Sequence, residues 1–196
     1  MKQFLFLLFC CTITQLAIAQ KNTWLVDKAH SSVRFTIKHL IISDVEGTFK
    51  TFNGTVKSAK PDFTDAEVDF TVSIASVDTD NETRDKQLQT SDYFDAGNYP
   101  DMTFKSTGIR KGKGSYYKLE GNLTIRGITR KVVFAVVYGG TVKDENGNTK
   151  AGFKASTSIN RNDFKVSGGN QVVGEDVAIT INVELQQQKA GSTSMN

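Results

Sequence analysis

Several segments of the chain alternate apolar with polar residues with a period of two, and this alternation constrains the fold more than any other feature. Successive side chains of a β-strand point to opposite faces, so the pattern predicts strands with one apolar face. Two clear cases are residues 33–38 (VRFTIK) and residues 66–74 (AEVDFTVSI). Similar alternation is found at 102–105, 119–125, 132–138 and 177–185, with strand-like pieces near 24–26, 47–52 and 152–159. The chain is predicted to form about eight to ten strands.

Short segments rich in glycine and asparagine separate the predicted strands. They supply residues that adopt positive φ, which tight hairpin turns require. These segments are 112–114 (GKG), 139–140 (GG), 144–148 (DENGN) and 167–170 (SGGN). Because hairpins join neighbouring strands of opposite direction, the strands are predicted to be antiparallel.

One segment, residues 82–89, is predicted to be a helix between strands. Asn81 is suited to cap its first turn, and Glu82 lies near the positive end of the helix dipole. Leu88 is expected to point inward.

Antiparallel strands with one apolar face bury that face either between two packed sheets or inside a closed barrel. Closure also removes the exposed edges that promote aggregation. Periodicity alone leaves both architectures open. The 196 residues, 38% of them hydrophobic, suit one domain with a single core, placed at residues 20–185 and followed by a flexible polar tail at 186–196.

The first nineteen residues have the pattern of a secretory signal peptide. Lys2 precedes the apolar run 4–11, and Ala17 and Ala19 form the small-residue cleavage pattern. Cleavage is expected after Ala19, which predicts a periplasmic or secreted protein. Both cysteines lie in this segment, so the mature chain is expected to have no disulfide and no cysteine metal ligand. No other segment is long and apolar enough to predict a membrane span.

The charge pattern excludes one large class of partner. The chain has 24 Lys and Arg against 21 Asp and Glu, a net charge of +3, without a basic block. A nucleic-acid binder concentrates basic residues on one face or in one segment. Nucleic acid is therefore not an expected partner, and no cofactor is predicted.

Four segments of the chain resemble the YceI family. They lie in the family's order and cover most of the predicted mature chain: residues 24–56, 73–107, 121–130 (GNLTIRGITR) and 151–164 (AGFKASTSINRNDF). The resemblance implies an all-β fold, a single antiparallel lipocalin-like β-barrel of about eight strands with one short helix between strands. It also implies an exported protein that binds polyisoprenoids or related long-chain amphiphiles in its interior, without established catalytic residues. The family usually has glycine after the Asp-Phe of the last motif, where this chain has Lys165.

The predicted ligand-binding residues are apolar side chains on or near strands, with three polar side chains. The apolar set is Val33, Phe35, Ile37, Phe49, Phe70, Phe94, Phe104, Leu123, Phe134 and Phe153, and the polar set is His39, Arg84 and Arg161. Small residues on the same strands, such as Gly121 and Ala155, would leave space between the rings. The sequence leaves open whether the side chains fill the barrel or enclose a ligand-sized cavity.

We predict different roles for the two histidines. His30 and His39 lie nine residues apart with Asp27 nearby, which is not the spacing of a helical or knuckle metal site, so no metal is predicted. His30 is expected to make a turn hydrogen bond. His39 shares the parity of Val33 and Phe35 and is expected to point inward, as a core residue or a ligand contact.

Arginine binds phosphate well because its planar fork donates two parallel hydrogen bonds. Arg84 or Arg161 is therefore a candidate contact for the head of a prenyl phosphate. The alternative is that each forms an ion pair, with Asp85 and Asp163 respectively, and holds a loop in place.

The function predicted from these features is that of an exported carrier of a long-chain isoprenoid lipid, either a polyprenyl phosphate or a quinone-type lipid. A fatty acid or fatty amide carrier of the same fold is the close alternative. Two further classes stay open: an enzyme at the barrel mouth that uses His39, and a structural envelope protein with a filled barrel. The chain is not expected to be an enzyme, and assembly as a homodimer stays open.

Overall fold

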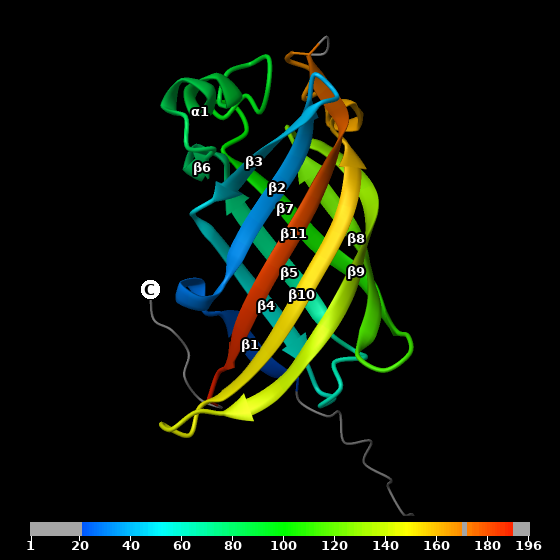
Figure 1. Ribbon diagram of the computed structural model, residues 1–196. Helices are drawn as coiled ribbons and strands as arrows, with labels where there is room; N and C mark the ends of the chain where they lie inside the picture. The colour runs from blue at the N-terminus through cyan, green and yellow to red at the C-terminus, as the bar shows by residue number, and fades with distance from the viewer. Residues whose placement is uncertain (1–20, 170–171, 190–196) are drawn as a thin grey trace, which may run out of the picture.

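The computed structural model describes residues 21–169 and 172–189, and its main feature is a single antiparallel sheet (Figure 1). The predicted signal peptide therefore lies outside the described residues, as does most of the predicted tail. The strands are β1 (Asn22–Val26), β2 (Ser32–His39), β3 (Ser43–Phe49), β4 (Phe52–Ser58), β5 (Glu67–Ser73), β6 (Val77–Asp78), β7 (Asp101–Lys111), β8 (Tyr116–Ile125), β9 (Ile128–Lys143), β10 (Thr149–Asn160) and β11 (Val173–Gln187). The helical segments are α1 (Glu82–Leu88) and three short 3-10 turns, η1 (Lys28–His30), η2 (Ile74–Ser76) and η3 (Arg161–Phe164).

The sheet closes into a barrel because β1 pairs with β4 on one side and with β11 on the other. The ring runs β1-β4-β5-β7-β8-β9-β10-β11, which is eight strands, and β2, β3 and β6 extend from the remaining length of β11. The predicted class, an antiparallel lipocalin-like barrel with one short helix, is confirmed. The sandwich is excluded, since closure leaves both edges of β1 paired.

The predicted helix is confirmed as α1, between β6 and β7. The Asn81 side chain accepts a hydrogen bond from the backbone N–H of Arg84 at 3.0 Å, which caps the first turn as predicted. Leu88 packs against the core beneath it. Among the described residues, no helix is long and apolar enough to cross a membrane.

Two strand boundaries differ from the sequence prediction. The predicted turn at 139–140 is wrong, because β9 continues through it and pairs with β10 on both sides. Gly140 has φ of 113° at a shift of register, so its positive φ serves a β-bulge within the barrel wall. β11 continues to Gln187, two residues beyond the expected domain end, because Gln186 and Gln187 pair with β1.

One end of the barrel is sealed by an aromatic cluster around Phe63. Phe63 lies in the β4–β5 connection and is only 2% exposed. Its ring centroid lies 5.1 Å from that of Trp24, 5.7 Å from that of Tyr138 and 5.0 Å from that of Phe153. Rings at such distances pack favourably, so the interior is closed at this end.

Asp65 organises the loop that carries Phe63. It accepts hydrogen bonds from the Ser58 hydroxyl at 2.6 Å and from the backbone N–H groups of Ala59 and Lys60 at 2.9 and 3.2 Å. Burial by itself raises the pKa of Asp65, but these hydrogen bonds outweigh it and lower the pKa to about 2.

We expect Asp65 to make stability depend on pH in the acid range. Because the pKa is lower in the folded protein than the ordinary value of 3.8, its contribution is full above pH 4 and is lost as pH falls toward 2. Allowing for solvent screening, the loss is about 1–2 kcal/mol. Urea unfolding at several pH values should show this component in the native protein and not in Asp65→Asn. Equal pH profiles for the two proteins would contradict the assignment.

Candidate functional site

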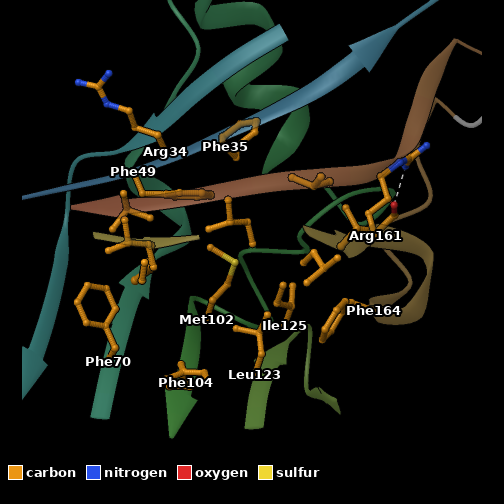
Figure 2. Close-up of a pocket in the computed structure, with 18 of the residues that line it drawn as sticks. Arg34, Phe35, Phe49, Phe70, Met102, Phe104, Leu123, Ile125, Arg161 and Phe164 are labelled. Carbon is orange, nitrogen blue, oxygen red and sulfur yellow. Dashed lines mark hydrogen bonds between the residues drawn. The ribbon is translucent and has the colours of Figure 1, made fainter. Parts of the chain in front are cut away.

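The barrel encloses a cavity of about 570 Å³ whose wall is almost wholly apolar. Figure 2 shows side chains from several strands pointing into this common space. Volumes of about 300–1,000 Å³ are typical of sites for small molecules and cofactors. Many inward-facing side chains, such as Phe35 and Phe70, are only half-buried because their inner surfaces face the cavity. The interior is therefore hollow, which the sequence left open.

The structure places all thirteen predicted ligand-binding residues on the wall of this one cavity. They are Val33, Phe35, Ile37 and His39 from β2, Phe49 from β3, Phe70 from β5, Phe104 from β7, Leu123 from β8, Phe134 from β9, Phe153 from β10, Arg84 from α1, Arg161 from η3, and Phe94 from the α1–β7 connection. The period-two argument thus placed these strand side chains on the inner face. Their role as ligand contacts stays a prediction.

Other lining residues were not nominated from the sequence. On β11 the inner face is formed by Val177, Ile179, Ile181, Val183 and Leu185. The alternation at 177–185 could have identified them as inward-facing residues. Gln87, Asp92 and Tyr93 line the cavity from α1 and the segment after it. No local sequence signal identifies these three, because only the fold of the α1 segment over the barrel brings them there.

Three phenylalanines lie flat on the barrel wall because each faces a glycine. Phe35 packs on Gly47, Phe70 on Gly54 and Phe104 on Gly121, and a Cβ atom built on any of these glycines would overlap the ring. Phe35 and Gly47 are direct cross-strand partners, as are Phe70 and Gly54. Rings that lie in these recesses leave the centre of the barrel empty.

We expect Gly121→Ala to push the Phe104 ring into the cavity. Such overpacking typically costs about 1–3 kcal/mol of stability, and here it also reduces the space for a ligand. The matched control is Gly108→Ala on the adjacent strand, where an added Cβ meets nothing within 4 Å. Urea unfolding should show a loss for Gly121→Ala and no loss for Gly108→Ala. A stable Gly121→Ala with an unchanged cavity in its crystal structure would show that the recess is not needed.

The cavity reaches the surface at the end opposite Phe63. Its wall there includes Arg84, Tyr93, Gly169 and Val172. Val172 is 42% exposed and also lines the cavity, so this end is the mouth.

Arg161 fixes the loop at the mouth and is 4% exposed. Its Nε donates to the Gly174 carbonyl at 2.7 Å, its Nη1 to the carbonyls of Val166 and Gly168 at 2.6 and 2.8 Å, and its Nη2 to the Val173 carbonyl at 3.1 Å. Burial lowers the pKa of Arg161, while Tyr93 and Glu175 act in the opposite direction. The side chain holds a loop, as one alternative predicted.

The ion pairs considered as the alternative for the two arginines do not form as predicted. Among the described residues, Asp163 forms no ion pair with Arg161, whose donors instead meet backbone carbonyls. Arg84 and Asp85 are joined through Thr79 rather than directly. Arg84 donates from Nε to the Thr79 hydroxyl at 2.8 Å and from Nη2 to its carbonyl at 2.7 Å, while Asp85 accepts from the Thr79 hydroxyl at 2.6 Å. Arg84 is thereby positioned at the cavity wall, and its Nη1 takes part in no hydrogen bond found among the described residues.

Lys165 occupies a position that favours glycine. Its φ is 57°, in the left-handed region, at the C-cap of η3. The turn therefore forms even though this chain has lysine where the family usually has glycine. The Lys165 carbonyl also accepts a hydrogen bond from Arg126 Nη1.

His39 lines the cavity, as its parity predicted. Within the part of the chain that the structure describes, no hydrogen bond or ion pair of its imidazole is found. A histidine that acts as a general base is usually oriented by a hydrogen-bond partner, and no such partner of His39 is found among these residues.

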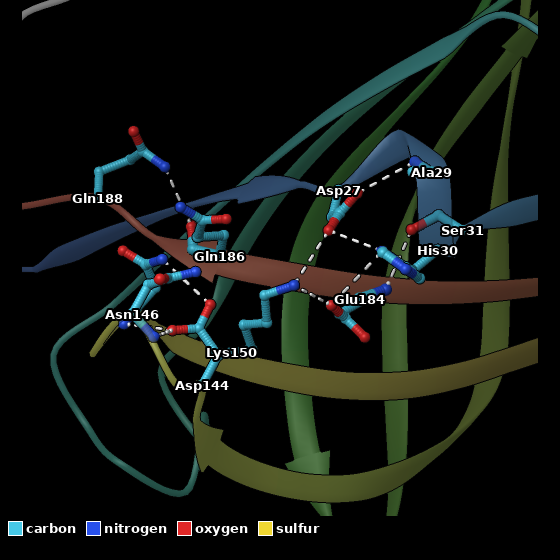
Figure 3. A network of polar contacts seen from close by, with 11 residues as sticks. Asp27, Ala29, His30, Ser31, Asp144, Asn146, Lys150, Glu184, Gln186 and Gln188 are labelled. Carbon is cyan, nitrogen blue, oxygen red and sulfur yellow. Dashed lines mark hydrogen bonds and ion pairs between the residues drawn. The ribbon is translucent and has the colours of Figure 1, made fainter.

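A separate polar cluster lies on the outer face of the barrel (Figure 3). His30 Nδ1 lies 3.0 Å from an Asp27 carboxylate oxygen, which confirms the expected turn hydrogen bond, and 3.9 Å from a Glu184 oxygen. These three groups are close enough together to hold a cation. However, the Lys150 ammonium lies 2.6 Å from Glu184 and 3.3 Å from Asp27, and it supplies the positive charge.

The charges of this cluster support one another. Glu184 and then Asp27 raise the pKa of Lys150, and the His30 hydrogen bond lowers that of Asp27, against the effect of burial. The arrangement is an ion-pair network at the β1–η1 corner, and His39 does not belong to it.

A closed antiparallel barrel of eight strands with an apolar internal cavity, sealed at one end and reaching the surface at the other, defines the lipocalin-like class. The chain belongs to the YceI-like domain family, whose model matches residues 24–185. The family resemblance of the sequence is thereby confirmed.

Individual relatives agree with this assignment. The chain is 34% identical to Protein YceI of Salmonella newport over 160 residues, which are 82% of this chain and 83% of that protein. It is 38% identical to the Campylobacter jejuni YCEI protein of known crystal structure, with a TM-score of 0.70 over 83% of this chain and 96% of that one. A polyisoprenoid-binding domain from Saccharophagus degradans shares the fold at 11% identity, with a TM-score of 0.66 over 84% of this chain and 98% of that one.

Proposed function

We propose that the protein binds one long-chain isoprenoid lipid inside the barrel and carries or sequesters it. The observation that carries this proposal is the apolar cavity of about 570 Å³, closed by Phe63 and open at one end. A chain-like apolar ligand fits such a blind tunnel. The architecture shared with a polyisoprenoid-binding domain of another protein supports the choice of ligand class.

The energetics of burial limit how much of the lipid is enclosed. At ~0.8 kcal/mol per methylene, complete burial of an isoprenoid of about 30–40 carbons would contribute ~24–32 kcal/mol before the cost of ordering a flexible chain. This exceeds the ceiling of ~18–21 kcal/mol for non-covalent binding. We therefore propose that the head and part of the chain stay at the mouth.

We propose that Arg84 contacts the polar head of the lipid. Thr79 fixes the position of its guanidinium at the mouth. Nη1, for which no hydrogen bond is found among the described residues, can donate to an acceptor such as a phosphate or quinone oxygen. Arg161 is the less suitable contact, because the four carbonyls around it already accept its hydrogen bonds.

We propose a binding role rather than a catalytic one for His39. It lies on the wall of an apolar cavity, and no hydrogen bond or ion pair of its imidazole is found among the described residues. We also propose that residues 1–19 direct export and are removed after Ala19, which N-terminal sequencing of the native protein would test.

The function is tested by native mass spectrometry of the protein as purified from its own host, followed by lipid extraction. The expected result is one bound isoprenoid per chain. A fatty acid or fatty amide in its place would establish the alternative carrier. Recovery of no lipid, together with no binding of added prenyl phosphate or quinone, would refute the proposal.

A further inference from the structure

Three consecutive apolar residues form the turn between β2 and β3, at the mouth of the barrel. Leu40, Ile41 and Ile42 are 51%, 91% and 86% exposed. The Leu40 N–H donates to the carbonyl of Val172 at 2.7 Å, which joins the turn to the loop before β11. We call Leu40, Ile41, Ile42 and Val172 the apolar tip. Figure 1 shows the β2–β3 turn and the start of β11 extending together beyond the end of the barrel, at the same end as α1.

Turn geometry does not explain these residues. Leu40 and Ile41 have φ of 50° and 67°, the left-handed values of a turn that favours asparagine and glycine. A β-branched residue is poorly suited to such a backbone. The chain thus places isoleucine where it is unfavourable locally and unpacked in the folded protein, which indicates a contact outside the molecule.

The apolar tip is continuous with the cavity. Val172 belongs to both, since it lines the cavity and is exposed beside Leu40. The nearest charges along the strands are Lys38 and Asp44, which pair with each other at 2.9 Å. The tip can therefore enter an apolar phase without taking an unpaired charge of these strands with it.

We propose that the apolar tip inserts into a lipid bilayer and so places the mouth of the cavity where a lipid can pass between membrane and barrel. This inference rests on the proposed function, because a bound isoprenoid must come from or go to a membrane. Side chains that penetrate about 5–10 Å reach the boundary between headgroups and acyl chains. A second copy of the chain is a poorer occupant. Four such side chains offer at most roughly 500 Å² of apolar surface. A stable dimer buries about 800 Å² per partner.

The test uses the triple variant Leu40→Asn, Ile41→Gly and Ile42→Ser. It removes the apolar side chains and gives the turn its preferred residues, so the fold is retained. None of the three residues lines the cavity. The matched control is Val133→Ser with Val142→Ser, two valines of β9 that are 50% and 63% exposed away from the tip.

Two measurements are made on the protein as purified from its own host. Co-sedimentation with vesicles of equal parts phosphatidylcholine and phosphatidylglycerol gives membrane binding, and transfer of a fluorescent prenyl lipid from these vesicles gives the rate of loading. We expect the triple variant to lower both at least tenfold and the valine control to lower neither by more than about twofold. Vesicle binding by the triple variant equal to that of the native protein would overturn the proposal. So would native protein that does not bind vesicles but dimerises through the tip.

A separate measurement distinguishes failure of the proposed function. Lipid added from ethanol without vesicles should bind the native protein and the triple variant equally. If neither protein binds it, the carrier function is refuted. If both bind it and both load from vesicles at one rate, only the membrane-docking proposal is refuted.

Discussion

Replacing Arg161 with alanine is expected to lower the free energy of unfolding by about 3–5 kcal/mol, among the largest effects of any single substitution in this protein. The change leaves the carbonyls of Val166, Gly168, Val173 and Gly174 without their donor. Each buried acceptor without a partner costs about 1–3 kcal/mol, and water entering at the mouth offsets part of the total. Urea unfolding measures the loss.

Two further variants separate the guanidinium fork from its charge. Arg161→Lys keeps the charge but not the planar set of donors, so it should lie between the native protein and Arg161→Ala. Arg126→Ala is the matched control, because Arg126 also donates to a loop carbonyl, that of Lys165, from an exposed position. It should cost less than about 1 kcal/mol. Equal losses for Arg126→Ala and Arg161→Ala would show that Arg161 does not hold the mouth loop.

Replacing Ala155 with tryptophan is expected to reduce lipid affinity about 50-fold or more. Ala155 lines the cavity from β10, so an indole there occupies space that a ligand would use. Displacing only three methylenes at ~0.8 kcal/mol each accounts for a loss of that size. Because the ring enters a hollow, stability should change by less than about 1 kcal/mol, below the usual cost of overpacking. Displacement of a fluorescent polyene fatty acid by a prenyl phosphate measures the affinity.

The matched control is Ser156→Trp, one residue along the same strand. Ser156 is exposed and points away from the cavity, so the same bulky residue should leave lipid affinity unchanged within about twofold. If Ala155→Trp binds lipid as tightly as Ser156→Trp does, the ligand does not occupy the barrel interior. A large loss of stability in Ala155→Trp alone would show that the wall cannot accept the ring.

Much of the wall could be predicted from the sequence. The parity of Val33, Phe35 and Ile37 places them on one face of a strand, and His39 follows the same rule. Strand periodicity is a local property, so it can be recognised without knowing which strands pair with one another. The same holds for α1, whose cap at Asn81 depends on residues within one turn.

Some features of the site depend on distant residues and could not be predicted. The sequence offered Asp163, two residues away, as an alternative partner of Arg161, but the donors of Arg161 reach carbonyls that the β10–β11 connection folds around it. Gly139 and Gly140 have turn chemistry, yet pairing with β10 turns them into a bulge within β9. In each case contacts between segments outweigh the local preference.

The sequence by itself determined which side chains face inward and that the strands must hide an apolar face, because a period of two is set by the backbone alone. Only the tertiary structure decided that the barrel is hollow. That outcome depends on the register that puts Phe35 opposite Gly47 and Phe70 opposite Gly54, and on the loop that brings Phe63 to one end. The exposure of Ile41 and Ile42 at the other end was decided in the same way, since burial is a property of the folded chain.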